Sequence, residues 1–283
     1  QPRSRGLGDV YKRQEIDMGT DHLKALKGDG LGKIIMNRPE ARNAMSDEMN
    51  AAMMATLEDF ENDSEVRAVI LTGSEGAFCA GGDVKGMANK KDDPKRTIDI
   101  AIHEQRIHQR GTSGKLFKMP KPTIAAVNGP AAGAGMSYAL SCDLRIMSNS
   151  AFFTTAFAKV GFSGDYGGSY FMTQLVGLSK AKELYFLSDK IPAEEALKLG
   201  LTNWVVKHEE LEQKTLEIAK QLAEGPAVAF RYMKENLNRA ESGEVDDCLD
   251  LEVTHHVHCG QTEDHKNATK AFVEKKQPVF KGR

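Results

Sequence analysis

The strongest limit on the fold of this chain is an order of strand, turn, helix and strand that occurs twice. In the first unit, Ser46 and two acidic residues precede a helical apolar pattern, and an apolar run follows at 68–71. In the second, a β-branched run at 123–127 leads through a Gly/Ala segment at 129–135 and a helix ending near 142 to an apolar run at 144–147. Strands joined through a helix lie parallel, so we expect an α/β protein with a largely parallel sheet.

The two ends of the chain differ from this central pattern. Residues 22–27 and 33–37 flank a Gly-Asp-Gly turn at 28–30, which predicts a hairpin. From residue 179 the pattern becomes helical, with helices expected at 181–187, 193–199, 211–223 and 227–237, two more before Pro278, and a strand-like interruption at 203–206. We expect a core over 15–205 and a helical region over 206–283. Residues 1–14 are basic and lack periodicity, and we interpret them as an artefact or a fragment tail.

Charge and cysteine usage argue against several classes of function. A formal net charge of -2 gives no general attraction to nucleic acid or to an anionic membrane. No apolar run approaches the roughly 20 residues that span a bilayer. The four cysteines lack the CxxC spacing of a zinc site and favour a reduced, cytoplasmic location; they are Cys79, Cys142, Cys248 and Cys259. Small molecules and copies of the chain itself are the expected partners, with no metal site.

Two glycine-rich segments carry the clearest chemical signal. The segment GAFCAGGDVKGM at 76–87 follows one strand, and NGPAAGAGMSYALSCD at 128–143 follows another and opens a helix. Small side chains let a ligand approach the backbone, and the first N–H groups of a helix are unpaired and favour negative charge. Taken singly, each segment is also typical of a packing turn.

As a pair, these segments resemble the signature of the enoyl-CoA hydratase and isomerase family, the crotonase superfamily. The similarity extends through NRPEARNAM at 37–45, LVGLSKAKELYFL at 175–187, AEEALKLGLTNWVV at 193–206 and a C-terminal FVEKKQPVF. The resemblance implies the crotonase fold, a spiral of repeated ββα units. It also implies that 15–205 carries an acyl-CoA site and that the C-terminal helices build trimers, often paired into hexamers.

Family positions supply the expected site residues. The backbone N–H groups of Gly82 and Ala134 match the oxyanion hole, which binds the thioester carbonyl. Coenzyme A arrives as part of the substrate, no other cofactor is expected, and the matching acyl-CoA positions are Ala41, Arg42, Ala44, Ala80, Gly81, Asp83, Val84, Gly133 and Phe157. For Asp83, a helix-cap or turn role remains open, since an anion beside an oxyanion hole opposes enolate formation.

The carboxylates expected of a hydratase are missing. Family hydratases place two glutamates where this chain has Ser137 and Phe157, and neither residue can act as a carboxylate base. Asp165 instead matches relatives that shift double bonds or open ring epoxides, and the epoxyphenylacetyl-CoA isomerase-like branch is the nearest resemblance. The residues alone favour a turn or cap role for Asp165 before two glycines, and only the family position reverses that preference. A dehalogenase branch uses this aspartate as a nucleophile but has tryptophan at position 157.

Other polar and aromatic clusters leave alternatives open. The aromatic residues near Asp165 can line an acyl pocket or belong to the core; they are Phe152, Phe153, Phe157, Phe162, Tyr166 and Tyr170. The group His255, His256, His258 and Cys259 lies in an expected helix, so a solvated or interface helix is favoured over a metal site. His103 and His108 receive no role. The alternatives to an isomerase are an atypical hydratase and a non-catalytic relative that binds CoA or RNA.

Overall fold

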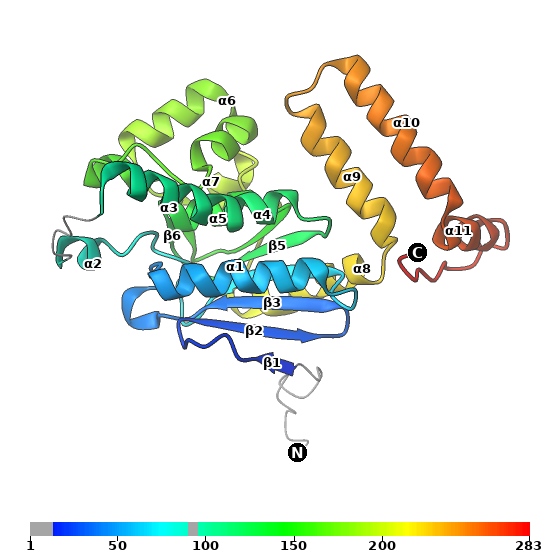
Figure 1. The fold of residues 1–283 in the computed structure, drawn as a ribbon, viewed down its shortest axis with the longest axis horizontal. Coiled ribbons are helices and arrows are strands. Elements are labelled where there is room, and N and C mark those ends of the chain that lie inside the picture. The colour runs from blue at the N-terminus through cyan, green and yellow to red at the C-terminus, as the bar shows by residue number, and fades with distance from the viewer. Residues whose placement is uncertain (1–13, 90–95) are drawn as a thin grey trace.

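A seven-stranded sheet forms the centre of the protein (Figure 1). The structure is a computed structural model that describes residues 14–89 and 96–283, so the expectation for the N-terminal tail falls almost entirely outside the described residues. In spatial order the strands are β1 (Gln14–Ile16), β2 (Leu23–Gly28), β3 (Leu31–Met36), β4 (Ala68–Gly73), β5 (Thr123–Val127), β7 (Leu144–Ser148) and β10 (Trp204–Val206). The first three are antiparallel and the rest pair in parallel, which confirms the expected hairpin and parallel sheet.

Helix α1 (Asp47–Asn62) connects β3 to β4 and covers one face of the sheet. The Ser46 hydroxyl accepts a hydrogen bond from the Met49 N–H at 3.1 Å, which caps the helix as expected. The apolar face is fully buried against the strands, with Phe60 lying directly over Gly32. An ideal Cβ at Gly32 would lie 2.5 Å from the Phe60 ring, so only glycine allows this contact.

A second, three-stranded sheet supports the segments that follow β5. Its strands are β6 (Ala131–Ala132), β8 (Phe152–Thr154) and β9 (Ile191–Pro192). The helices between β4 and β10 along the chain are α2 (Val84–Asn89), α3 (Ile98–Gly111), α4 (Ser113–Lys118), α5 (Ala134–Ser141), α6 (Gly168–Leu187) and α7 (Ala193–Lys198). Helix α6 begins at Gly168, thirteen residues before the expected start at 181, and at Gly177 its backbone leaves the helical conformation with φ 75°. The kink breaks the apolar pattern, which explains the wrong start.

The C-terminal part contributes one helix to the sheet and three that stand beside the core. Helix α8 (Leu211–Ala223) buries Leu211, Ala219 and Ala223 against Ile70 and Ile124 on the face opposite α1. Helices α9 (Ala227–Ala240), α10 (Val245–Gln261) and α11 (Glu263–Val273) project away from the sheet (Figure 1). In the described part of the chain, no helix has the length and apolar character to cross a membrane.

Candidate active site

The two glycine-rich segments leave the carboxyl ends of neighbouring parallel strands, β4 and β5, and meet there. The N–H of Ala132 donates to the Cys79 carbonyl at 2.9 Å, and the N–H groups of Phe78 and Cys79 donate to the Pro130 carbonyl at 3.1 and 3.2 Å. Cys79 and Ala131 form a parallel bridge. The sequence therefore predicted two parts of one site, and the sheet topology brings them into direct contact.

Gly81 lies close to the backbone of the second segment. An ideal Cβ at Gly81 would lie 2.7 Å from the Ala132 carbonyl oxygen and 3.4 Å from the Ala134 nitrogen. Gly81 also has φ 89°, a conformation that strains any other residue. Glycine is thus required here both by space and by backbone conformation.

The backbone N–H groups of Gly82 and Ala134 have the arrangement of an anion-binding pair. Each follows a glycine with positive φ, Gly81 at 89° and Gly133 at 52°. Ala134 is the first residue of α5, where the helix leaves its leading donors unpaired. Neither N–H donates to another group within the described residues. Two free donors on adjacent segments can bind one oxygen that gains negative charge.

The segment at 41–45 lies against the first glycine-rich segment. The Ala80 N–H donates to the Arg42 carbonyl at 3.0 Å, and the Met45 N–H donates to the Gly81 carbonyl at 2.8 Å. Buried Asn43 fixes the junction, since its Nδ2 donates to the Ala77 carbonyl at 2.9 Å. The expected CoA positions around Ala44 and Ala80 are therefore neighbours, and they form a strip beside Gly82.

The side chain of Asp83 stabilises the local structure through hydrogen bonds. Its Oδ1 accepts a hydrogen bond from the Gly86 N–H at 2.9 Å and its Oδ2 accepts from Arg38 at 3.2 Å. The hydrogen bond from Gly86, together with Arg38, holds the pKa of the carboxyl below its ordinary value. The alternative interpretation of Asp83 as a cap for α2 therefore has direct support, while Val84, the first residue of α2, is half exposed.

Asp165 is different, because its side chain makes no turn or cap hydrogen bond. The backbone carbonyl of Asp165 accepts from the Ser137 hydroxyl at 3.1 Å and from the Gly168 N–H at 3.0 Å. Its Oδ1 is buried and has no hydrogen-bond partner among the described residues. Burial raises the pKa of Asp165 to about 6. A buried carboxylate with a raised pKa and no partner has the properties of a general base.

Ser137 connects Asp165 to the second glycine-rich segment. It lies one turn after Ala134 in α5, and its hydroxyl also donates to the Gly133 carbonyl at 3.3 Å. Cys79, on the other segment, is close enough that the Asp165 charge adds to the burial that raises the thiol pKa to about 12. Asp165 therefore faces the junction of the two segments.

Among the aromatic residues, Phe157 lies at this junction. An ideal Cβ at Gly133 would lie 3.5 Å from its ring, which stacks on Tyr185 at a centroid distance of 5.8 Å. The other candidates divide between core and surface: Phe153 and Tyr166 are buried in the core, Phe162 is 57% exposed, and Phe152 lies beneath Lys190. Tyr170 donates to Glu241. Sequence reasoning missed Tyr185, whose apolar-looking helical position carries no signal of a buried polar contact.

The histidines of α10 have different surroundings. His255 is buried and stacks on Tyr232 at 4.1 Å, while His256 and His258 are exposed on α10. No cluster of metal-ligating side chains exists among residues 14–89 and 96–283. His103, on α3, is exposed.

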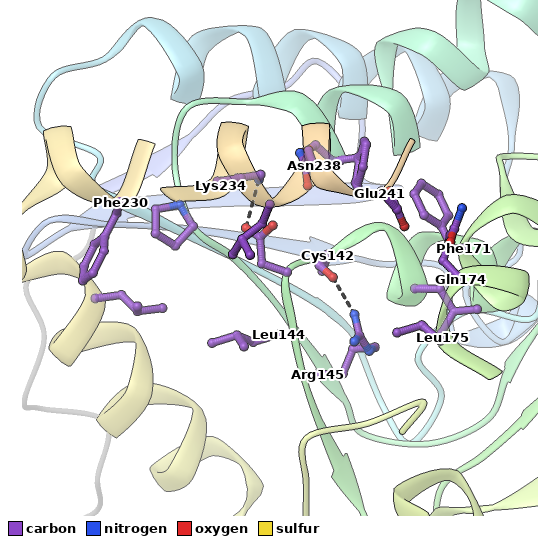
Figure 2. A pocket seen from close by; sticks show the side chains of 16 residues that line it. Cys142, Leu144, Arg145, Phe171, Gln174, Leu175, Phe230, Lys234, Asn238 and Glu241 are labelled. Carbon is purple, nitrogen blue, oxygen red and sulfur yellow. Dashed lines mark hydrogen bonds and ion pairs between the residues drawn. The ribbon is translucent and has the colours of Figure 1, made fainter. Parts of the chain in front are cut away.

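A cavity of about 460 Å³ lies away from these residues, between α9 and the core. Figure 2 shows Phe230 and Lys234 of α9 facing Leu144 and Cys142, with Phe171 and Leu175 of α6 at the other end. The Lys234 ammonium bridges the space to Asp143 at 2.9 Å. Gly82, Ala134 and Asp165 do not line this cavity, so it is separate from the candidate site.

Comparisons with known proteins agree with this geometry. The family described as enoyl-CoA hydratase/isomerase matches residues 27–283. The chain is 34% identical to 1,2-epoxyphenylacetyl-CoA isomerase of Escherichia coli K12 over 90% of its length and 96% of that protein's. It is 38% identical to short-chain-enoyl-CoA hydratase of Clostridium acetobutylicum, covering 86% and 91%.

A solved structure confirms the expected crotonase fold. The crystal structure of an enoyl-CoA hydratase from Polaromonas sp. JS666 matches with a TM-score of 0.85 and 31% identity, over 92% of this chain and 99% of that one. With the family match and the paired glycine-rich segments, this shows that the chain belongs to the enoyl-CoA hydratase/isomerase, or crotonase, family.

Proposed function

We propose that this member of the family is an acyl-CoA isomerase that moves a double bond, or opens a ring epoxide, with Asp165 as its acid-base group. The observation that carries the proposal is the buried Oδ1 of Asp165, which has no partner among the described residues, on a residue whose backbone carbonyl shares the Ser137 hydroxyl with that of Gly133. The two positions where family hydratases hold glutamates contain Ser137, which is committed to backbone carbonyls, and Phe157.

The chemistry requires one oxyanion site and one base. The thioester carbonyl accepts hydrogen bonds from the N–H groups of Gly82 and Ala134, each worth about 3 to 4 kcal/mol as negative charge develops. Asp165 removes a proton from one carbon, the electron pair moves into the enolate, and the same carboxyl returns the proton to another carbon. No further reactant is needed, since the product is an isomer of the substrate.

The substrate we propose is an unsaturated or ring-epoxide acyl-CoA thioester. Similarity to 1,2-epoxyphenylacetyl-CoA isomerase supports an aromatic acyl group, and Phe157 beside Gly133 offers it an apolar contact. The thioester's CoA part would lie along the strip of Ala41, Arg42, Ala44, Ala80 and Gly81. Hydration is the second candidate, favoured by the 38% identity to a short-chain-enoyl-CoA hydratase.

We also propose that the protein works as a trimer or hexamer. Helix α10 exposes a stripe of apolar residues at four-residue spacing, Val245, Leu249, Val253 and Val257, each at least half exposed. Such a stripe on a projecting helix is typical of a face that another subunit covers.

The four cysteines are free, which supports a reducing, cytoplasmic location.

Two assays run side by side test the reaction. One measures double-bond migration in an unsaturated acyl-CoA, and the other measures hydration of crotonyl-CoA. We expect the wild-type protein to isomerise faster than it hydrates, and Asp165→Asn to lose isomerisation. Asp189→Asn, which neutralises an exposed carboxylate, is the control and should behave as wild type. Rapid hydration that survives Asp165→Asn would overturn the assignment.

A further inference from the structure

Tyr185, on α6, carries a buried hydroxyl that the mechanism above does not use. Its Oη has no hydrogen-bond partner among the described residues, and the same holds for Oδ1 of Asp165. Burying a polar group without a partner is unfavourable, so such groups usually mark a site of function. One of these atoms is a hydrogen-bond donor and the other an acceptor, and both lie beside the same turn.

Two glycines allow the phenol to lie against the Asp165 turn. An ideal Cβ at Gly164 would lie 3.1 Å from Cε1 of Tyr185 and 3.6 Å from its Oη. An ideal Cβ at Gly168 would lie 2.7 Å from Oη and 2.3 Å from the Ser137 Oγ. Residues on both sides of Asp165 thus leave room for the Tyr185 hydroxyl. A side chain at either glycine would push it away.

The opposite side of the ring is held by Phe157. The two rings stack with an interplanar angle of 21°, and the Phe157 ring lies 3.5 Å from where a Cβ at Gly133 would be. Tyr185 therefore fills the space between Phe157 and the Asp165 turn, and its hydroxyl is directed at the buried polar group formed by Asp165 and Ser137.

We propose that Tyr185 is a positioning residue that donates a hydrogen bond to the Asp165 carboxylate and keeps this base ionised and oriented toward the thioester. The proposal rests on the proposed role of Asp165 as the base. The phenol and carboxylate are not hydrogen-bonded to each other in the structure, although the Asp165 charge acts on Tyr185; the proposal requires a rotation about the Asp165 Cα–Cβ bond or one bridging water. Donation to a carboxylate favours its charged form.

The titratable side chains around Asp165 do not change protonation in the pH range where Asp165 does. Burial raises the pKa of the Cys79 thiol to about 12, and it raises the pKa values of Tyr138, Tyr166 and Tyr185 above their ordinary value, with the Asp165 charge adding to each. All four groups are neutral between about pH 5 and 8. A change in activity near pH 6 therefore reports the protonation of Asp165 alone among these neighbours.

The test compares the pH dependence of kcat/KM for Tyr185→Phe and wild type. The pKa of about 6 belongs to an Asp165 that has no donor, so the wild-type acidic limb should lie below pH 6. Because the variant loses the donor, we expect the limb to move up by about one pH unit, with kcat at pH 5 falling roughly fivefold and recovering above about pH 7. KM should change less than about twofold. The thermal midpoint should fall by no more than about 2 to 4 °C, since the change removes one hydrogen bond and leaves the ring in place. Tyr170→Phe removes a hydroxyl from the same helix, away from Asp165, and is the matched control.

An unchanged acidic limb in Tyr185→Phe would overturn the inference, and would leave Tyr185 as a packing residue or a donor to Ser137. Should the phenylalanine variant melt early, 3,5-difluorotyrosine at position 185 keeps the shape and strengthens the donor. With this residue, the acidic limb of the pH profile must move to lower pH. A limb that stays at the wild-type pH contradicts the inference. Failure of the proposed function looks different, because Asp165→Asn would then retain wild-type isomerisation whatever Tyr185 does.

Discussion

Gly135 lies so close to Cys79 that an ideal Cβ at Gly135 would be 2.2 Å from the Cys79 carbonyl oxygen. This contact joins the first turn of α5 to the segment after β4, and so fixes Ala134 relative to Gly82. The carbonyl belongs to rigid backbone that also accepts the Ala132 N–H at 2.9 Å, and it cannot move aside without breaking that bond. The spacing of the two proposed oxyanion donors, the N–H groups of Gly82 and Ala134, thus depends on the absence of a side chain at Gly135.

Gly135→Ala should therefore destabilise the protein despite the higher helix propensity of alanine. We expect the free energy of unfolding to fall by about 2 kcal/mol or more, measured by urea denaturation, because the methyl group overlaps the Cys79 carbonyl. Gly260→Ala in α10 is the control, because a Cβ there meets nothing within 4 Å. It should be neutral or stabilising by up to about 1 kcal/mol. Equal stability of the two variants would contradict the close contact.

Ala134→Val tests the second oxyanion donor. Ala134 is fully buried at the first position of α5, so a branched side chain there moves the N–H away from the thioester oxygen. We expect turnover to fall by about 30-fold or more, a loss of about 2 kcal/mol, in protein that still folds and binds acyl-CoA. Activity within about threefold of wild type would show that Ala134 does not belong to the oxyanion hole.

Asp165→Asn should stabilise the protein at neutral pH. Burial raises the folded-state pKa of Asp165 from 3.8 to about 6, so the folded protein holds this proton more tightly than the unfolded chain. Stability from this group is thus complete below about pH 4 and is lost as the pH rises through about 6. The variant should gain about 1 to 2 kcal/mol at pH 8 and almost nothing at pH 4, measured by denaturant titration. A gain independent of pH would argue against ionisation as its cause.

The apolar stripe of α10 should determine assembly. A charge in its centre, Leu249→Glu, is unfavourable when another subunit covers the stripe and harmless when water does. Sedimentation should show trimers or hexamers for wild type and smaller species for this variant. Thr254→Glu adds the same charge to an exposed polar position on the same helix and should assemble normally. A wild-type protein that is monomeric at micromolar concentration would contradict the proposed assembly.

Local patterns explain what the sequence could predict. The cap of α1 by Ser46 and the β-branched run of β5 are signals contained within a few residues, and both elements lie where expected. Strands β6, β8 and β9 have only two or three residues, too few to show a period, and they exist because their neighbours pair with them. The start of α6 was hidden by its glycines.

In the candidate site, too, local signals could be predicted and tertiary environments could not. The glycine-rich segments were recognisable because close backbone approach requires small residues, and the structure brings Gly81 against Ala134. The environment of Asp165 was not predictable, since its burial depends on α5 and α6 and on Phe157, all placed by tertiary packing. Tyr185 was missed for that reason. Its relation to Asp165, twenty residues earlier, arises only when α6 packs behind the turn.

The most direct test of the central claim is mass spectrometry of an unsaturated acyl-CoA incubated with the protein in deuterated water. We predict that wild type incorporates deuterium as the double bond moves, that Asp165→Asn incorporates none, and that Asp165→Asn still binds the thioester. Asp165→Glu should retain part of the exchange, because a proton shuttle needs only reach and a suitable pKa. Deuterium incorporation at the wild-type rate in Asp165→Asn, or a covalent acyl-aspartyl or aryl-aspartyl enzyme in the same spectra, would contradict the assignment of Asp165 as a proton shuttle.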